Sequence, residues 1–208
     1  MISLFPQRND LRRWMLFVDG ENLTIRAQKV AEANRLTLTE GANYRKDTFI
    51  WLPGIKPTIA LVNNPGTPVK VEEHAIRAHY YTSVVGDQEL FKSVRESLWS
   101  LGFHPEVFRK PSKDTKAKGV DIALTKDMLS HAFLNNYDVA ILVAGDGDYV
   151  PLVEEVKRLG KVIYVLFFET NGISPELRVS SDMFFHLQER FLEQWNNGLR
   201  LTDNEVHL

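Results

Sequence analysis

The sequence predicts an α/β fold in which helices cover both faces of a mostly parallel central sheet of about five to six strands. Short apolar segments alternate with longer amphipathic segments, and several of the apolar segments end directly in aspartate or glycine. Alternation of this kind is typical of βαβ units, whose parallel strands need a helical crossover. A length of 208 residues suits one domain, expected over residues 1–208 in three α/β/α layers.

The first half of the chain contains three predicted strands and two predicted helices. Its opening apolar run, WMLFV, is too short for a buried helix and stops at Asp19 and Gly20, which indicates a strand. Aromatic and β-branched residues mark the next strand, and apolar residues at helical spacing before Gly102 mark a helix. The predicted strands are 14–18, 76–85 and 103–108, and the predicted helices are 21–33 and 87–101.

The second half repeats the alternation. Its central run, DVAILV, is continuously apolar, as expected of a parallel strand covered on both faces. Gly160 follows the next amphipathic stretch and ends a helix there. The predicted helices are 120–135, 149–159 and 174–179, the predicted strands are 138–143, 162–168 and 183–187, and the tail is expected to be helical to Trp195.

Residues 34–72 interrupt the pattern. They have no helical period and are too long for an ordinary connection, so we expect an insertion that forms a hairpin or a flap. Its aromatic residues Tyr44, Phe49 and Trp51 admit two interpretations. They pack against the core, or they are exposed and serve a homodimer contact or stack on bases.

Composition bounds the class of protein. Hydrophobic residues make up 44% and charged residues 25%, and there is no cysteine, which excludes disulfides and thiolate metal sites. No apolar run approaches the roughly 20 residues that a membrane helix needs, and the N-terminus has no signal-peptide pattern. We therefore expect a cytoplasmic protein that makes no membrane contact.

Four aspartates follow the predicted strands or precede a helix. Asp19 ends the first strand, Asp146 and Asp148 follow the central strand, and Asp121 is in the first turn of a later helix. Ligands of open parallel sheets bind at the carboxyl ends of the strands, so these carboxylates are expected to converge. Close carboxylates repel one another unless cations neutralise them, and hard oxygen ligands favour Mg²⁺ or Mn²⁺.

Each aspartate also has a purely structural interpretation. Asp19 could form a turn with Gly20, Asp121 could complement a helix dipole, and Asp148 could be a helix N-cap. For Asp146 the structural alternative is weakest, because the apolar strand that precedes it places it at the carboxyl edge of the sheet.

Further polar residues are candidates for substrate binding. Asn22 could hold a phosphate or a metal-bound water, although it could equally cap the helix. Thr125 lies one turn after Asp121 and could face the same cleft. A basic segment near the acidic site suits a polyanionic substrate, although it could be a solvated loop; its cations are Arg109, Lys110, Lys113, Lys116 and Lys118.

Four segments together resemble the NYN family, the PIN-like nuclease domains that include LabA-like bacterial proteins. They are FVDGENL at 17–23, KGVDIALTKDML at 118–129, YDVAILVAGDGDYVPLVEEVKRLGKVIYV at 137–165 and SPELRVSSDMFFHL at 174–187. The glycine-aspartate signature after an apolar strand is fairly specific when the first two segments precede it. The resemblance leaves out the first ten residues, residues 34–72 and the tail.

The resemblance implies a PIN-like fold and metal-dependent cleavage of RNA. Asp19, Asp121, Asp146 and Asp148 match the acidic metal-binding positions of the family, and Asn22 matches its asparagine. Ala144 departs from the family pattern, in which serine is common.

Two other functions remain open at this point. One is a nucleic-acid-binding or regulatory module of the same fold with negligible turnover, since a fold alone does not establish catalysis. The other is an aspartyl-phosphate phosphatase, which is disfavoured because Glu21 stands where a second aspartate would be expected. The partner expected from the first interpretation is RNA, with single-stranded DNA as another candidate.

Overall fold

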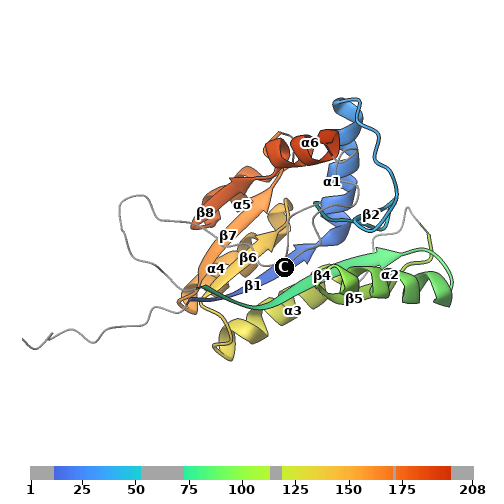
Figure 1. Ribbon diagram of the computed structural model, residues 1–208. Helices are drawn as coiled ribbons and strands as arrows, with labels where there is room; N and C mark the ends of the chain where they lie inside the picture. Colours follow the sequence, from blue (N-terminus) through green and yellow to red (C-terminus); the bar gives the residue numbers. More distant parts are fainter. Residues whose placement is uncertain (1–11, 53–72, 113–118, 171, 198–208) are drawn as a thin grey trace, which may run out of the picture.

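The computed structural model describes residues 12–52, 73–112, 119–170 and 172–197, and a six-stranded sheet runs through its centre (Figure 1). The strand order is β5-β4-β1-β6-β7-β8, and all neighbouring pairs are parallel. The expected mostly parallel sheet of five to six strands is therefore confirmed. Its strands are β1 (Arg12–Asp19), β4 (Glu73–Val84), β5 (His104–Arg109), β6 (Val139–Val143), β7 (Val162–Phe167) and β8 (Met183–His186).

Helices cover both faces of this sheet and complete the three layers (Figure 1). One face packs against α1, α2 and α6, and the other packs against α3, α4 and α5. The bounds are α1 (Gly20–Ala33), α2 (Gln88–Ser100), α3 (Val120–Phe133), α4 (Val150–Arg158), α5 (Pro175–Ser180) and α6 (Gln188–Asn197), with a 3₁₀ turn η1 (Gly147–Tyr149) before α4. Within the described ranges, none of these helices has the length and hydropathy to cross a bilayer.

The apolar run of β1 supplies both cores. Trp14, Leu16 and Val18 pack into the core under α1, whereas Met15 and Phe17 pack into the core under α3 and α4. Successive side chains of a strand point to opposite faces, so a strand covered on both sides has to be apolar at every position. β1 is consequently fixed in the middle of the sheet, and its end becomes a fixed point for the functional site.

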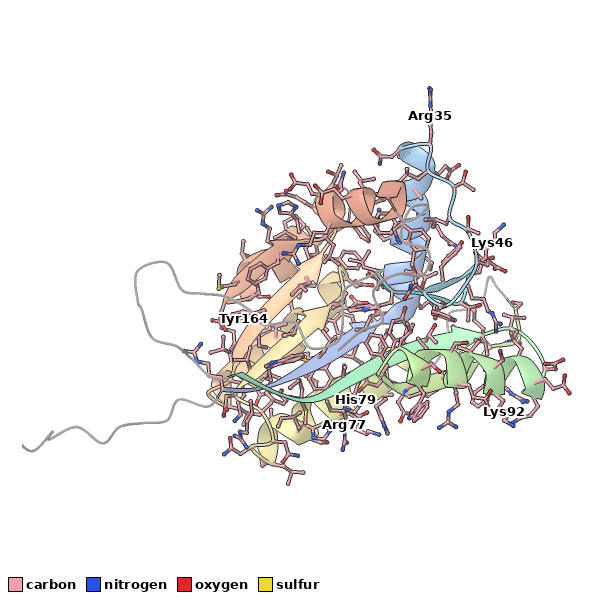
Figure 2. All side chains as sticks on the ribbon, in the orientation of Figure 1. Arg35, Lys46, Arg77, His79, Lys92 and Tyr164 are labelled. Carbon is pink, nitrogen blue, oxygen red and sulfur yellow. The ribbon has the colours of Figure 1, made fainter. Side chains whose placement is uncertain are left out.

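The segment that interrupts the predicted pattern contains a two-stranded antiparallel hairpin, formed by β2 (Tyr44–Arg45) and β3 (Phe49–Ile50). Tyr44, Phe49 and Trp51 are all at most 4% exposed and belong to the core beside α1. Packing against the core is therefore the interpretation that holds, and these three rings are not available for a dimer contact or for base stacking. Lys46 lies at the turn of this hairpin (Figure 2).

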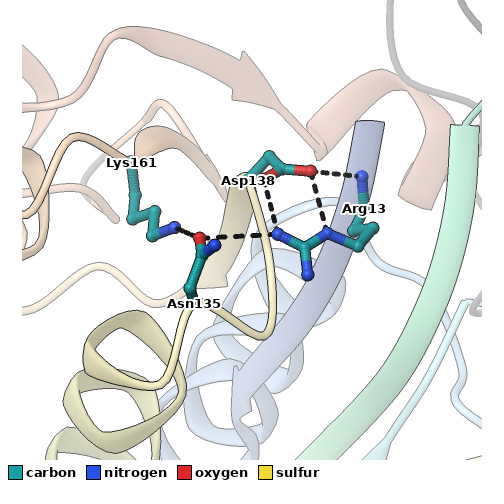
Figure 3. A network of polar contacts seen from close by, with 4 residues as sticks. All are labelled: Arg13, Asn135, Asp138 and Lys161. Carbon is teal, nitrogen blue, oxygen red and sulfur yellow. Dashed lines mark hydrogen bonds and ion pairs between the residues drawn. The ribbon is translucent and has the colours of Figure 1, made fainter. Parts of the chain in front are cut away.

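A polar network closes the amino-terminal edge of the sheet (Figure 3). Asp138, just before β6, accepts hydrogen bonds from the backbone nitrogen of Arg13 at 2.9 Å and from its guanidinium Nε and Nη2 at 3.2 and 2.9 Å. Arg13 and Lys161 both donate to Asn135 Oδ1. The network joins β1 to the connection between α3 and β6, and so fixes how these two central strands align.

Candidate functional site

The carboxyl ends of β1 and β6 lie side by side, and the residues that follow them form a hollow of about 150 Å³. β1 ends at Asp19 and passes directly into α1, whereas β6 ends at Val143 and is followed by Asp146 before the turn η1. The first turn of α3 approaches from the other side. Together these elements line the hollow with Asp19, Glu21, Asn22, Ile25, Val120, Asp121 and Asp146.

Asp19 is the most buried of the acidic residues, with 4% of its surface exposed. Its Oδ1 accepts a hydrogen bond from the backbone nitrogen of Asn22 at 3.0 Å, which caps α1. Burial raises the pKa of Asp19 to about 7 against the lowering effect of the hydrogen bonds from Asn22 and Tyr149, and the charges of Asp121 and Glu21 raise it further. The fold thus places a carboxyl group where its charged form is unfavourable.

Tyr149 connects two of the carboxylates. Its hydroxyl lies 2.9 Å from Oδ2 of Asp19 and 3.2 Å from Oδ1 of Asp121. A phenol carries one hydrogen, so it can donate fully to only one of them and accept from the other only when that carboxyl is protonated. Burial, followed by these two negative charges, raises the pKa of Tyr149. The ring is 3% exposed and therefore holds both carboxylates in a defined position.

Asn22 ties the two strand ends together. Its side-chain Oδ1 accepts a hydrogen bond from the backbone nitrogen of Gly145 at 3.0 Å, across 123 residues of sequence. The capping role considered for Asn22 belongs instead to Asp19, whose carboxylate accepts a hydrogen bond from the Asn22 backbone nitrogen. The amide of Asn22 therefore sets the position of the loop that carries Asp146.

Two glycines allow the backbones to approach at this edge. A Cβ atom at Gly20 would lie 2.0 Å from the ring of Tyr80, and one at Gly145 would lie 2.3 Å from the ring of Phe167. Neither glycine has a positive φ, so close approach rather than an unusual turn requires them. Gly145 lets the loop after β6 lie against the ring of Phe167 and the carbonyl oxygen of Gly172.

Asp146 and Asp148 have different positions around η1. Asp146 lines the hollow, and its Oδ1 accepts from the backbone nitrogen of Asp148 at 3.1 Å, so it is the N-cap of this turn. Asp148 is exposed, is not among the residues that line the hollow, and was the residue considered as an N-cap. The capping role thus falls on Asp146, although this does not prevent its other oxygen from binding a ligand.

Glu21 and Lys110 form an ion pair at the side of the hollow. Lys110 Nζ lies 2.7 Å from Glu21 Oε1, with the two side chains 8% and 24% exposed. The hydroxyl of Ser83 donates to the other oxygen of Glu21 at 2.7 Å. Lys110 therefore lies near the acidic residues as expected, but its charge is already compensated by Glu21.

The other predicted binding residues are more distant or lie outside the described ranges. Arg109 contacts Gln88 and lies over the ring of Phe91, both on the side of α2. Thr125 is partly exposed on α3 and is not among the residues that line the hollow. The remaining predicted cations lie outside the described residues: Lys113, Lys116 and Lys118.

The donor chemistry of the hollow suits a divalent cation such as Mg²⁺ or Mn²⁺. Asp19 and Asp121 reach the same hydroxyl, Asp146 lines the same space, and a cation would relieve the buried Asp19. In the part of the chain that the structure describes, no three histidine, aspartate or glutamate side chains are arranged closely enough to hold an ion. Asp146 is exposed, so its side chain can rotate toward an ion placed beside Asp19 and Asp121.

Sequence reasoning missed Tyr149 and Glu21. Tyr149 directly follows Asp148 in GDGDY, and an aromatic residue beside two acidic ones was the available signal. Glu21 was considered only as the absence of a second aspartate after Asp19. Nothing in the sequence pairs Glu21 with Lys110, because they are 89 residues apart.

Comparisons with known proteins agree with this architecture. The family described as NYN domain matches residues 13–188. A solved structure of a protein of unknown function from Vibrio parahaemolyticus is 23% identical, with a TM-score of 0.57 over 89% of this chain and 99% of that one. At this identity the similarity shows a shared fold alone. No curated protein matches the sequence.

Proposed function

Because the chain belongs to the NYN domain family, we propose that its acidic hollow is the active site of a metal-dependent ribonuclease that hydrolyses phosphodiester bonds. The observation that carries this proposal is the convergence of Asp19, Asp121 and Asp146 on one hollow at the carboxyl end of a parallel sheet. Burying Asp19 there makes its charged form unfavourable, and capping α1 does not by itself require a carboxylate, since serine, threonine or asparagine caps a helix as well.

Asp19, Asp121 and Asp146 would hold one or two Mg²⁺ or Mn²⁺ ions, with Asp148 as a further ligand or as a group that orients water. Such an ion activates a water molecule and offsets the negative charge that develops on the phosphate oxygens. No histidine or serine nucleophile is then needed.

The chain's own residues provide the positioning. Tyr149 holds Asp19 and Asp121 through one hydroxyl, so two ligands arrive with fixed orientations. Asn22 holds the backbone at Gly145 and so fixes the loop that carries Asp146. Because these side chains are already held in place before the substrate binds, fewer groups have to reorganise during the reaction.

The test is cleavage of labelled RNA and DNA in Mg²⁺ or Mn²⁺, with an EDTA control, by the wild type and by Asp146→Asn. We expect metal-dependent RNA cleavage that the variant loses by at least about 10³-fold, because one ligand of the ion becomes neutral. Glu96→Gln is the matched control, since Glu96 is an exposed carboxylate on α2 whose side chain is 66% exposed. It should cleave like the wild type.

The variant is informative only when it is folded, so its circular dichroism spectrum and melting temperature accompany the assay. Equal activity in a folded Asp146→Asn protein would exclude Asp146 from the chemistry. Binding of Mn²⁺, followed by calorimetry, gives a second readout that does not depend on turnover, and it should weaken in Asp19→Asn.

One observation favours a second function. No trio of ligating side chains is preassembled among the described residues, as would be expected of a nucleic-acid-binding module of this fold with negligible turnover. A folded wild type that binds Mn²⁺ and RNA but does not cleave would support this alternative over the nuclease.

A further inference from the structure

A second and larger hollow, of about 420 Å³, adjoins the acidic one. We call it the hairpin pocket, because its outer wall is the β2–β3 hairpin and its inner wall is α1 and the end of β4. Glu21 and Ile25 line both hollows, so the two hollows share a boundary. A volume in this range is sufficient for a small ligand or for one unit of a polymer.

The hairpin brings positive charge to this pocket from outside the predicted basic segment. Arg45 and Lys46 line it, and Lys110 lines it from β5's end. Lys110 is compensated by Glu21. Arg45 has a neutral partner, Ser93 Oγ at 3.3 Å, and the Lys46 ammonium makes no ion pair or hydrogen bond with the described residues.

Two acidic residues of the hairpin, Glu40 and Asp47, make contacts with other parts of the structure. Glu40 Oε1 accepts from the backbone nitrogen of Lys46 at 2.8 Å, which holds the hairpin turn. Asp47 Oδ1 accepts from Gln28 Nε2 at 3.1 Å, toward α1. Arg45 and Lys46 are thus the groups in this wall that suit a phosphate.

The apolar part of the pocket is exposed beside the acidic site. Ile25 is 48% exposed and Val85 is 37% exposed, and Leu90 lines the same pocket. Their aliphatic surfaces suit the face of a base, but they offer no donor or acceptor with which to distinguish one base from another. Contacts of this kind tolerate any sequence and require the base to be unpaired.

We propose that the hairpin pocket holds one nucleotide of a single-stranded RNA next to the scissile bond. Its phosphate lies against Arg45 and Lys46, and its base packs on Ile25 and Val85. This inference rests on the proposed nuclease function for the position of the scissile bond, whereas the binding itself requires no catalysis. It assigns a substrate-selecting role to the hairpin that interrupts the fold.

The test is the affinity of a fluorescein-labelled single-stranded RNA, measured by anisotropy in EDTA so that nothing is cleaved. Lys46→Ala is compared with Lys92→Ala, which removes the same charge from α2, where the side chain is 76% exposed (Figure 2). We expect a loss of about fivefold or more for Lys46→Ala and less than twofold for Lys92→Ala. In a plot of the logarithm of the association constant against the logarithm of the salt concentration, the magnitude of the slope should fall by about one for Lys46→Ala.

A second variant tests the base contact. Val85→Asp places a negative charge in the pocket at a partly exposed position, so the fold is retained. It should abolish the preference for single-stranded over duplex RNA. Equal affinity of the Lys46→Ala and Lys92→Ala proteins, or an unchanged preference in Val85→Asp, would overturn the proposal.

The two proposals fail in different ways. Loss of binding in the hairpin variants, without any cleavage by the wild type, would exclude the nuclease function and support the proposed role of the hairpin pocket. If these variants retain metal-dependent cleavage and their affinity for RNA is unchanged, the proposed role of the hairpin pocket is excluded and the nuclease function is supported.

Discussion

Asp19 ends β1 and Asp138 lies beside its beginning, yet the fold treats the two carboxyl groups in opposite ways. At the amino-terminal edge, hydrogen bonds from Arg13 lower the pKa of Asp138 against the effect of its partial burial (Figure 3). At the carboxyl edge, burial raises the pKa of Asp19 to about 7 and two further acids stand nearby. The same residue type forms an ion pair at one end of the strand, whereas at the other end it makes no ion pair with the described residues.

The difference separates a residue that stabilises the fold from one that costs stability. An aspartate paired with arginine favours folding at neutral pH, whereas a buried carboxyl beside other acids opposes it. Natural proteins retain such unfavourable groups mainly where they serve a function. Substitution of Asp19 should therefore reduce activity, whereas substitution of Asp138 should reduce stability.

The largest expected effect is on cleavage. Asp19→Asn should reduce metal-dependent RNA cleavage by about 10³-fold or more while leaving the protein at least as stable, because a neutral amide replaces an unfavourably buried acid. Asp138→Asn should leave cleavage within about twofold. Both are measured as single-turnover rates at saturating Mn²⁺, together with melting temperatures. The opposite ranking of the two variants would show that Asp138, and not Asp19, takes part in cleavage.

His79 shows how burial shifts the pKa of a histidine whose ring nitrogens have no hydrogen-bond partner among the described residues. It is 3% exposed, both of its ring nitrogens lack a hydrogen-bond partner, and burial lowers its pKa to about 4. His104, His131 and Arg77 lower it further, and Asp127 raises it. Above pH 6.5 His79 is neutral in both the folded and the unfolded chain. As the pH falls toward 4, the unfolded chain binds a proton that the folded protein does not bind, so the folded state loses stability.

Between pH 6.5 and pH 4 this histidine should cost the protein up to roughly 3 kcal/mol of unfolding free energy. Urea titrations at both values measure it, and His79→Phe is the matched variant. Its ring would keep the stacking with Phe17 and Tyr81 and should remove that part of the pH dependence. An NMR titration that finds the pKa of His79 near 6.5 would contradict this expectation.

The sequence was sufficient for the sheet and for the position of three of the four aspartates expected at its carboxyl edge, whereas Asp148 does not line the hollow. Alternating apolar runs placed the strands and helices near their observed ranges, because a parallel strand covered on both faces has a distinctive composition, as in β6. Asp19, Asp121 and Asp146 lie together as expected, because residues that follow parallel strands share one edge of the sheet.

Contacts between segments that are distant in the sequence could not be predicted from it. The pairing of Glu21 with Lys110 and the bond from Gly145 to Asn22 join segments about ninety residues or more apart, and no local pattern encodes them. The burial of Tyr44 and Trp51 depends on how the hairpin packs against α1, which the irregular sequence of that segment does not reveal.

Tyr149→Phe tests the support of the carboxylates at the carboxyl edge, because it removes the hydroxyl that Asp19 and Asp121 share. We expect cleavage to fall about tenfold, since the two carboxylates lose a common orienting group, and stability to change by about 1 kcal/mol. Activity and urea midpoints measure these effects. Unchanged cleavage would mean that the carboxylates need no such support. Tyr164→Phe, on β7, is a control for loss of a phenol elsewhere in the sheet.

The smallest expected effect is the stability lost at the amino-terminal edge. Arg13 and Asp138 are 32% and 38% exposed, so water screens their attraction, and Asp138→Asn should cost about 1 kcal/mol at neutral pH. Because the pKa of Asp138 is lowered in the folded state, this stabilisation is lost as the pH falls below the ordinary value of 3.8 toward the folded one. A double-mutant cycle with Arg13→Gln, followed by urea unfolding at neutral and acidic pH, isolates the pair. A coupling energy that persists after Asp138 is protonated would show that hydrogen-bond geometry, rather than charge, stabilises this edge.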